Sequence, residues 1–319
     1  MRMPAGLTHQ LQEGNGPARL AAMLAGLIGV AAAGAAAGAQ PTFRARTDLV
    51  RVDALVTQGG TPVRGLGAAD FEVRDNGVLQ RVTAARTVGS VRLGVVLDAS
   101  GSMTGERLGL ARAATDDLLS QLQAGDGFVL LAFGDQVARL GRPGAPAADA
   151  LAALDRLRAA GGTALVDALH AGIVEADDGP GPKLLLLMTD GRNNASWLQA
   201  GGVIDVARRH ETVVYPVAVG VDRQWARTSV LPSLRTSDSH ALLRVIADET
   251  GGRHIEAGWD AGLGTVFRQI LDEYRQRYVL TFTPEGVSTG DGWHALEVKV
   301  TRRGARVRAR TRYWAGTGE

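Results

Sequence analysis

Apolar and polar residues follow two different rhythms along the chain, and the rhythm changes near residue 90. Between residues 47 and 88 they alternate with a period of about two, as in Leu49 to Val56, which is the pattern of strands with one buried face. Glycine-containing turn sequences such as Asp75-Asn76-Gly77 separate these runs. The segment 40–89 is therefore predicted to form a small antiparallel β unit.

Beyond residue 90, continuous apolar runs alternate with stretches in which apolar residues recur at helical spacing. Such runs are typical of strands that are buried on both faces of a parallel sheet. The predicted strands are 91–97, 128–133, 184–189 and 213–219. The predicted helices are 107–123, 147–158, 164–177, 203–210, 241–250 and 261–275. This order predicts an α/β fold over residues 90–282, a Rossmann-like, doubly wound and mostly parallel sheet with helices on both faces.

The helical pattern stops after residue 278, and strand-like segments follow at 278–283, 294–300 and 307–313. The pattern leaves open whether the first of them, which contains Leu280, extends the α/β sheet. The other two are predicted to form a C-terminal β hairpin within 283–319 that packs with the N-terminal β unit. Both flanks of the α/β domain would then share one small accessory β region.

The first 39 residues differ from the rest of the chain and have the pattern of an export signal peptide. The stretch from Leu20 to Gln40 carries no charge, is rich in Ala, Leu, Ile and Val, and ends in the small residues Ala37-Gly38-Ala39. We expect cleavage near Gln40 and hence a periplasmic, cell-surface or secreted protein. The alternative is an uncleaved membrane anchor, because about twenty uncharged residues can span a bilayer.

The composition is that of a soluble globular protein, and it narrows the chemistry. Hydrophobic residues make up 45% of the 319 residues and charged residues 21%, and a net charge of +2 is too small to predict nucleic-acid binding. Cysteine is absent, which excludes disulfides, thiolate metal sites and a lipid-anchored cysteine. Any metal ion must therefore be held by oxygen or imidazole ligands.

Three short segments combine oxygen-bearing side chains with glycine, and each follows a predicted strand or opens a helix. In a doubly wound sheet, sites form at the carboxyl ends of the strands beside a topological switch point, so Asp98 and Asp190 can meet there. Oxygen ligands without Cys or clustered His select a hard cation such as Mg²⁺, Mn²⁺ or Ca²⁺. The segments are Asp98-Ala99-Ser100-Gly101-Ser102, Gly161-Gly162-Thr163-Ala164-Leu165 and Thr189-Asp190-Gly191.

Together these three segments resemble the metal-ion-dependent adhesion site of the von Willebrand factor A family, and the resemblance extends over about residues 90–278. It implies that Ser100, Ser102 and Thr163 bind the ion directly, whereas Asp98 and Asp190 orient water bound to it. Thr163 and Asp190 exchange the role of direct ligand between the open and closed states of that family.

The flanking sequences resemble a narrower group, a bacterial exported family of von Willebrand factor A-related proteins. The matching segments are Asp70 to Gly77 before the α/β domain, and Gly292-Trp293-His294 with Val307 to Arg310 after it. This second resemblance sharpens the expected architecture but implies neither a partner nor a reaction.

The resemblance implies protein binding rather than catalysis. Hydroxyls are neutral ligands, so a bound divalent ion stays electrophilic and can take an Asp or Glu side chain of a partner in place of one water. The expected function is metal-dependent protein binding, or adhesion, in the bacterial cell envelope, without enzyme activity. The first alternative is a structural or assembly component of an envelope complex in which the metal only stabilises the loops, and the second is a metal-assisted hydrolase.

The residues themselves argue against two kinds of enzyme site. Ser100 lacks the Gly-x-Ser-x-Gly surroundings of a hydrolase nucleophile, no His is tied to it by a motif, and the Gly-x-x-x-x-Gly-Lys phosphate loop is absent. Asp135 and Asp167 are interpreted as structural, the first as a turn residue and the second as a helix-surface residue.

The C-terminal segment is basic, and its arginines are predicted to lie on one face of a strand. The preferred interpretation is a solvent face whose charges keep an edge strand from pairing with another chain. The alternative is a contact for an acidic partner or an anionic surface. The arginines concerned are Arg306, Arg308, Arg310 and Arg312.

Overall fold

The computed structural model describes residues 49–220, 239–259, 262–288 and 292–315, which belong to one compact unit spanning Arg46–Glu319. The predicted export signal, residues 1–39, lies outside the described residues. The central sheet has six strands in the order β11-β10-β9-β6-β7-β8. Five run parallel, and β8 is antiparallel to β7 at one edge. The strands are β6 (Arg92–Asp98), β7 (Gly127–Phe133), β8 (Val137–Gly141), β9 (Lys183–Thr189), β10 (Val213–Val219) and β11 (Ile255–Ala257).

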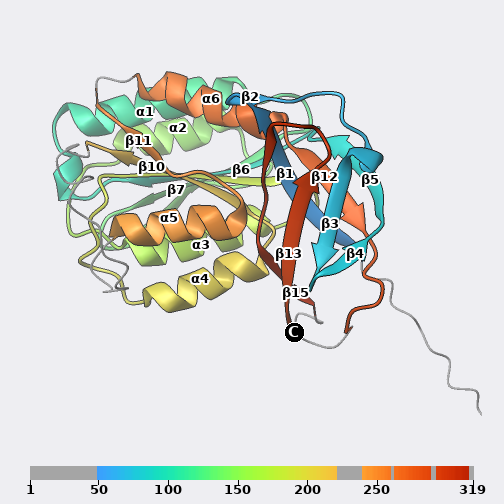
Figure 1. Cartoon of the computed structure of the whole chain (residues 1–319). Coiled ribbons are helices and arrows are strands. Elements are labelled where there is room, and N and C mark those ends of the chain that lie inside the picture. Colours follow the sequence, from blue (N-terminus) through green and yellow to red (C-terminus); the bar gives the residue numbers. More distant parts are fainter. Residues whose placement is uncertain (1–48, 221–238, 260–261, 289–291, 316–319) are drawn as a thin grey trace, which may run out of the picture. The chain divides into compact units, whose positions relative to one another are not determined.

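Helices cover both faces of this sheet (Figure 1). One face carries α1 (Glu106–Ser120), α2 (Ala147–Arg156) and α6 (Leu263–Arg275). The other carries α3 (Leu165–Asp177), α4 (Ala200–Arg209) and α5 (Ser239–Thr250). None of the helices in the described part of the chain is long and apolar enough to cross a membrane.

Each central strand contributes to two cores, which explains its continuous apolar sequence. In β9, Leu184, Leu186 and Met188 pack with the first set of helices, whereas Leu185 and Leu187 pack with the second. A strand buried on both faces needs apolar residues at every position. The sequence pattern therefore located β6, β7, β9 and β10 to within one residue at each end.

The expectation of an α/β fold is confirmed, and the central sheet is mixed because β8 runs antiparallel to β7; the doubly wound parallel arrangement stays a prediction. The sequence pattern missed β8 and β11. Strand β8 lies at the edge of the sheet, and only Gly141 among its residues is buried, so it lacks the apolar run that reveals a central strand. Strand β11 has three residues, which is too short to establish a period.

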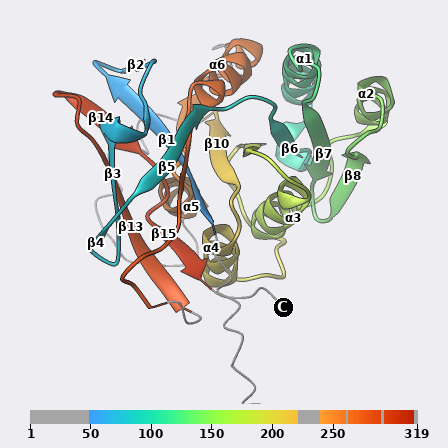
Figure 2. The ribbon, with the colours of Figure 1, turned by 90° about the vertical axis from the view of Figure 1, so that its right-hand side faces the viewer.

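Two antiparallel sheets, built from both flanks of the chain, complete the unit (Figure 2). They enclose a core of their own, in which Val52, Val73, Leu280 and Phe282 are at most 1% exposed. The first sheet has the order β14-β1-β12-β5, with β2 beside β1, and consists of β14 (Ala305–Arg308), β1 (Val50–Gln58), β12 (Tyr278–Phe282), β5 (Val82–Thr87) and β2 (Thr61–Pro62). The second has the order β15-β13-β3-β4 and consists of β15 (Arg312–Ala315), β13 (Gly292–Val300), β3 (Phe71–Asp75) and β4 (Val78–Gln80).

The segment that contains Leu280 belongs to this accessory region. Strand β12 pairs antiparallel with β1 on one side and with β5 on the other. Strands β13 and β15 also pair antiparallel, whereas β14, which lies between them in the sequence, joins β1 in the first sheet. Whether residues 90–282 fold independently of their flanks stays a prediction.

The prediction that the C-terminal arginines share one face of a single strand is wrong. The chain leaves the first sheet at Arg308 and enters the second at Arg312. Arg310 lies between the two strands, is 8% exposed, and donates through Nη2 to the carbonyl oxygens of Arg208 and His210 at 2.6 and 2.9 Å. Alternation along a short segment cannot show that the segment bends from one sheet into another.

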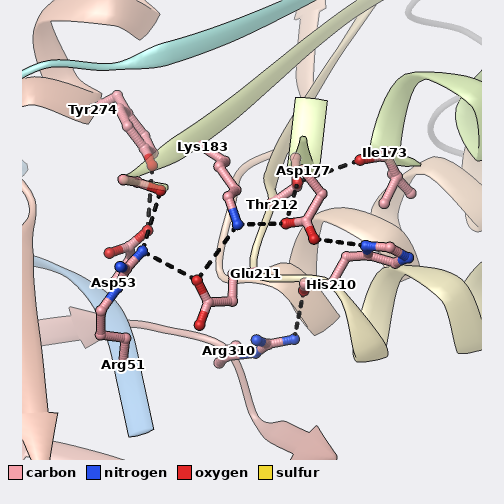
Figure 3. Close-up of polar contacts among 11 residues, drawn as sticks. Arg51, Asp53, Ile173, Asp177, Lys183, His210, Glu211, Thr212, Tyr274 and Arg310 are labelled. Atoms are coloured by element: carbon pink, nitrogen blue, oxygen red, sulfur yellow. Dashed lines mark hydrogen bonds and ion pairs between the residues drawn. The ribbon is translucent and has the colours of Figure 1, made fainter. Parts of the chain in front are cut away.

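A polar cluster lies where the amino ends of β9 and β10 meet β1 (Figure 3). Lys183 Nζ lies 2.9 Å from Asp177 Oδ1 and 3.6 Å from Glu211 Oε2, and Arg51 Nη2 lies 3.1 Å from the same Glu211 oxygen. Burial acts to raise the pKa of Asp177, but hydrogen bonds from His210 and Lys183 outweigh it and lower that pKa. Each charge in this cluster therefore faces an opposite one.

Candidate metal centre

The first segment of the predicted site forms the turn that leads from β6 towards α1. Asp98 is the last residue of β6 and is fully buried, and Ser100 is 1% exposed. The backbone N–H of Ser100 donates to Asp98 Oδ1 at 2.9 Å. Ser102 lies in the short 3-10 helix η2 (Gly101–Met103), and its Oγ is 3.0 Å from Ser100 Oγ. The turn thus places two hydroxyls side by side above a buried carboxylate.

The third segment follows β9, the strand that pairs with β6. Thr189 ends β9, and its hydroxyl donates to Asp98 Oδ2 at 2.8 Å. Asp190 comes next, and its Oδ1 accepts the backbone N–H of Arg192 at 3.3 Å. Gly191 has φ +86°, and a Cβ there would lie 2.4 Å from His240 Nε2, so glycine is required.

The second segment, Gly161 to Thr163, is tied to the first by backbone hydrogen bonds. The N–H of Gly101 donates to the carbonyl oxygen of Gly161 at 3.0 Å. The N–H of Ala160 donates to the carbonyl oxygen of Ala99, also at 3.0 Å. Thr163 is 2% exposed and lies just before α3. The loop is therefore held against the turn that carries Ser100 and Ser102.

Electrostatics links the two aspartates. Burial raises the pKa of Asp98, hydrogen bonds from Ser100 and Thr189 act to lower it, and the neighbouring charge of Asp190 raises it further. Arg192 Nε lies 4.0 Å from Asp190 Oδ2, but the Arg192 side chain is 73% exposed. The donors that reach Asp98 directly are neutral.

The fold thus brings the three predicted segments to the carboxyl ends of β6 and β9. Sequence reasoning missed the residues that fix these segments to one another. Thr189 was noted only as part of its segment, although its hydroxyl holds Asp98. Asn194 accepts the N–H of Thr163 through Oδ1 at 2.7 Å and donates its own N–H to the carbonyl oxygen of Thr163 at 3.0 Å. An asparagine four residues after an Asp is common in loops, so the sequence held no signal for this role.

The donor set fits a small, hard divalent cation. Within the described part of the chain, no three His, Asp or Glu side chains gather to hold an ion, so hydroxyls must supply part of any coordination shell. Adjacent ligands of an octahedral Mg²⁺ with bonds of about 2.1 Å lie roughly 3 Å apart. The Ser100 and Ser102 oxygens, 3.0 Å apart, match that spacing, which also allows a hydrogen bond between them.

Comparison with known proteins matches part of the chain to a known domain family. Residues 93–193 match the family model of the von Willebrand factor type A domain. A curated relative, the uncharacterized protein sll0103 of Synechocystis sp., is 37% identical over 111 residues, which are 32% of this chain and 26% of that protein. The match thus spans about a quarter of the curated relative.

Several solved structures are similar at low identity. A proximal thread matrix protein of the mussel byssus, with a zinc-occupied MIDAS motif, is 18% identical with a TM-score of 0.49, and the match covers 63% of this chain and 50% of that one. A von Willebrand factor type A protein from Catenulispora acidiphila is 16% identical with a TM-score of 0.48, covering 85% and 75%. An aerotolerance-related membrane protein from Bacteroides fragilis is 17% identical with a TM-score of 0.44, covering 59% and 100%.

Proposed function

Because the chain carries a von Willebrand factor type A domain, we propose that it binds a partner protein through a divalent cation held at the carboxyl ends of β6 and β9. The observation that carries the proposal is the setting of Asp98. Its carboxylate is fully buried, its donors are the neutral N–H of Ser100 and hydroxyl of Thr189, and the nearby charge of Asp190 has the same sign. A buried carboxylate without a counter-charge is costly. A cation beside the two serines would supply that charge.

The same contacts explain why the cation would bind a partner. Each oxygen of Asp98 accepts one hydrogen bond from the protein, and we assign this carboxylate the role that the family resemblance implies, which is to orient water bound to the ion. Ser100, Ser102 and Thr163 would supply neutral hydroxyls, and Asp190 would orient water. Such an ion keeps most of its charge and attracts an Asp or Glu side chain of another protein. Mg²⁺ is the ion we assign, with Mn²⁺ as a close substitute.

We place this binding function in the cell envelope and assign no catalytic activity to the site. The location rests on the uncharged segment from Leu20 that ends in Ala37-Gly38-Ala39. The absence of a catalytic role rests on the sequence around Ser100, which lacks the Gly-x-Ser-x-Gly surroundings of a hydrolase nucleophile and has no His tied to it by a motif.

A metal titration tests the first step of the proposal. Calorimetry with Mn²⁺ should show one binding event in the wild type, and Ser102→Ala and Asp98→Asn should weaken it by roughly 10- to 100-fold. Ser90→Ala is the matched control, because Ser90 is exposed and precedes β6 at the opposite end of the strand. Equal Mn²⁺ affinity in Ser102→Ala and the wild type would refute the assignment of this residue.

A second measurement separates partner binding from a purely structural metal. The protein is immobilised and exposed to envelope extract in Mg²⁺ or in excess chelator, and the captured proteins are identified. Our proposal expects capture that is lost in chelator and in Ser102→Ala alike. If chelator lowers the unfolding temperature but leaves capture unchanged, the metal only stabilises the loops and the protein is a structural component.

A further inference from the structure

One large apolar side chain near the candidate metal centre projects into solvent. Trp197 is 91% exposed, the largest exposed fraction among the large apolar side chains of the described residues, and its neighbour Leu198 is 45% exposed. Single exposed leucines or valines are ordinary on protein surfaces. A nearly fully exposed tryptophan is different, because its large apolar surface stays in water and folding of the chain gains nothing from it.

The backbone that carries this side chain is held firmly. The Asp167 carboxylate, in the first turn of α3, accepts the N–H of Trp197 through Oδ2 at 3.0 Å and that of Leu198 through Oδ1 at 2.9 Å. Ser196 Oγ accepts the N–H of Val166 at 3.0 Å. The loop thus accepts a hydrogen bond from the start of α3 and donates two hydrogen bonds to it. Fixed presentation of an anchor side chain reduces the entropy lost on binding.

The same loop reaches the candidate metal centre. The N–H groups of Asn194 and Ala195 donate to the carbonyl oxygen of Thr163 at 3.0 and 3.2 Å. Trp197 lies three residues after Asn194, and three residues of chain span at most about 11 Å. An interface of ordinary size buries about 800 Å² of surface on each partner, which corresponds to a patch with a radius of roughly 16 Å. A partner that reaches Thr163 therefore also lies within reach of Trp197.

We propose that Trp197 is a second anchor for the partner that binds at the metal centre, and that this partner presents an acidic side chain beside an apolar surface that receives the indole. The inference rests on the proposed function, because the metal centre fixes where the partner sits. Tryptophan is among the residues most enriched at binding hot spots. Arg192, 73% exposed and close to Asp190, adds a positive charge beside the site that suits an acidic surface.

The test is a selection of random displayed peptides on the full chain in Mg²⁺. Peptides enriched on the wild type should combine an Asp or Glu with an aromatic or large aliphatic residue at a fixed spacing. Affinities of these peptides are then measured in solution. Trp197→Ala should weaken binding by roughly 30-fold or more, the loss typical of a hot-spot residue, whereas Trp197→Phe should retain most of it. Leu79→Ala, at a 58% exposed apolar residue of β4 in the accessory region, should have no effect.

Metal binding provides a readout that separates the two proposals. Trp197→Ala should bind Mn²⁺ as tightly as the wild type, which also shows that the site is intact. If the selected peptides require Mg²⁺ and Ser102 but bind Trp197→Ala as tightly as the wild type, the anchor is wrong and the proposed function stands. If the peptides bind Trp197→Ala more weakly than the wild type, but bind equally well in chelator and to Ser102→Ala, the tryptophan binds partners without the metal and the proposed function is wrong. A selection that enriches no peptide over the bare support contradicts both.

Discussion

Replacing Arg277 by methionine should destabilise the protein strongly, because this buried cation connects the α/β sheet to the accessory region. Arg277 is fully buried between α6 and β12. Its Nη1 donates to the Tyr215 hydroxyl at 3.1 Å. Its Nη2 donates to the carbonyl oxygens of Gly251, Asp53 and Arg308 at 2.8, 3.0 and 3.3 Å. These partners lie on β10, after α5, on β1 and on β14, so one guanidinium ties the α/β sheet to the accessory region.

The size of the effect follows from what the substitution leaves behind. Methionine fills a similar volume but donates no hydrogen bond, so the buried carbonyl oxygen of Gly251 and the partly buried one of Asp53 each lose a donor. Each unsatisfied buried group costs about 1–3 kcal/mol. The Asp53 carboxyl also loses a compensating charge, because burial raises its pKa and Arg277 acts to lower it. Relief from burying the guanidinium offsets part of this loss, so we expect a net loss of about 2–4 kcal/mol, the scale of two unsatisfied buried groups.

Urea unfolding followed by circular dichroism measures the change. Arg86→Met is the matched control, because Arg86 is exposed on β5 next to the same strand β12, and surface substitutions usually shift stability by at most about 0.5 kcal/mol. If Arg277→Met unfolds within about 0.5 kcal/mol of the wild type, the buried hydrogen bonds contribute nothing net and the reasoning fails. A loss of comparable size in Arg86→Met would show that the effect is not specific to burial.

Three further predictions concern the loop of Trp197, the pH dependence of stability and export. Asp167→Ala should loosen the loop and lower the affinity for the selected peptides by roughly 3- to 10-fold, because the backbone of Trp197 is then ordered only on binding. The affinity for Mn²⁺ should stay unchanged. Burial lowers the pKa of His254 to about 4. Between pH 6.5 and 4 the unfolded chain therefore binds a proton that the folded protein does not, and the stability of the fold decreases as the pH falls. The urea midpoint of His254→Gln should depend less on pH in that window than the midpoint of the wild type. Intact mass of the exported protein should correspond to a chain that begins near Gln40, and recovery of chains with Met1 in the membrane fraction would favour an anchor.

The sequence carried most of the information about the central sheet and the three site segments. Strands β6 and β9 are apolar at nearly every position and end in an aspartate or in Thr189-Asp190, so both the strands and the polar residues at their carboxyl ends stand out. Parallel strands in one sheet bring such ends together without any further information. This is why Asp98 and Asp190, about ninety positions apart, could be expected to lie close together from the order of the strands.

The residues that hold the site together were not predictable in the same way. Asn194 bonds to Thr163, and Asp167 bonds to Trp197, across separations of about thirty residues and without periodicity. These contacts depend on how two loops meet in space, which the alternation of apolar residues does not encode. The bend at Arg310, where the chain passes from one accessory sheet to the other, was missed for the same reason.

The two polar clusters at opposite ends of the central strands show why only one of them is assigned a ligand. At the amino ends, Asp177 and Glu211 face Lys183, and the cavity beside Glu211 and Arg51 has a volume of about 10 Å³, room for about one water molecule. At the carboxyl ends, Asp98 is buried with neutral donors and another carboxylate nearby. The first cluster is balanced by the protein itself and stabilises the contact between β1 and the α/β sheet. We propose that the second is balanced by a bound cation, which attracts an acidic side chain of the partner, while the neighbouring Trp197 packs against an apolar surface of the same partner.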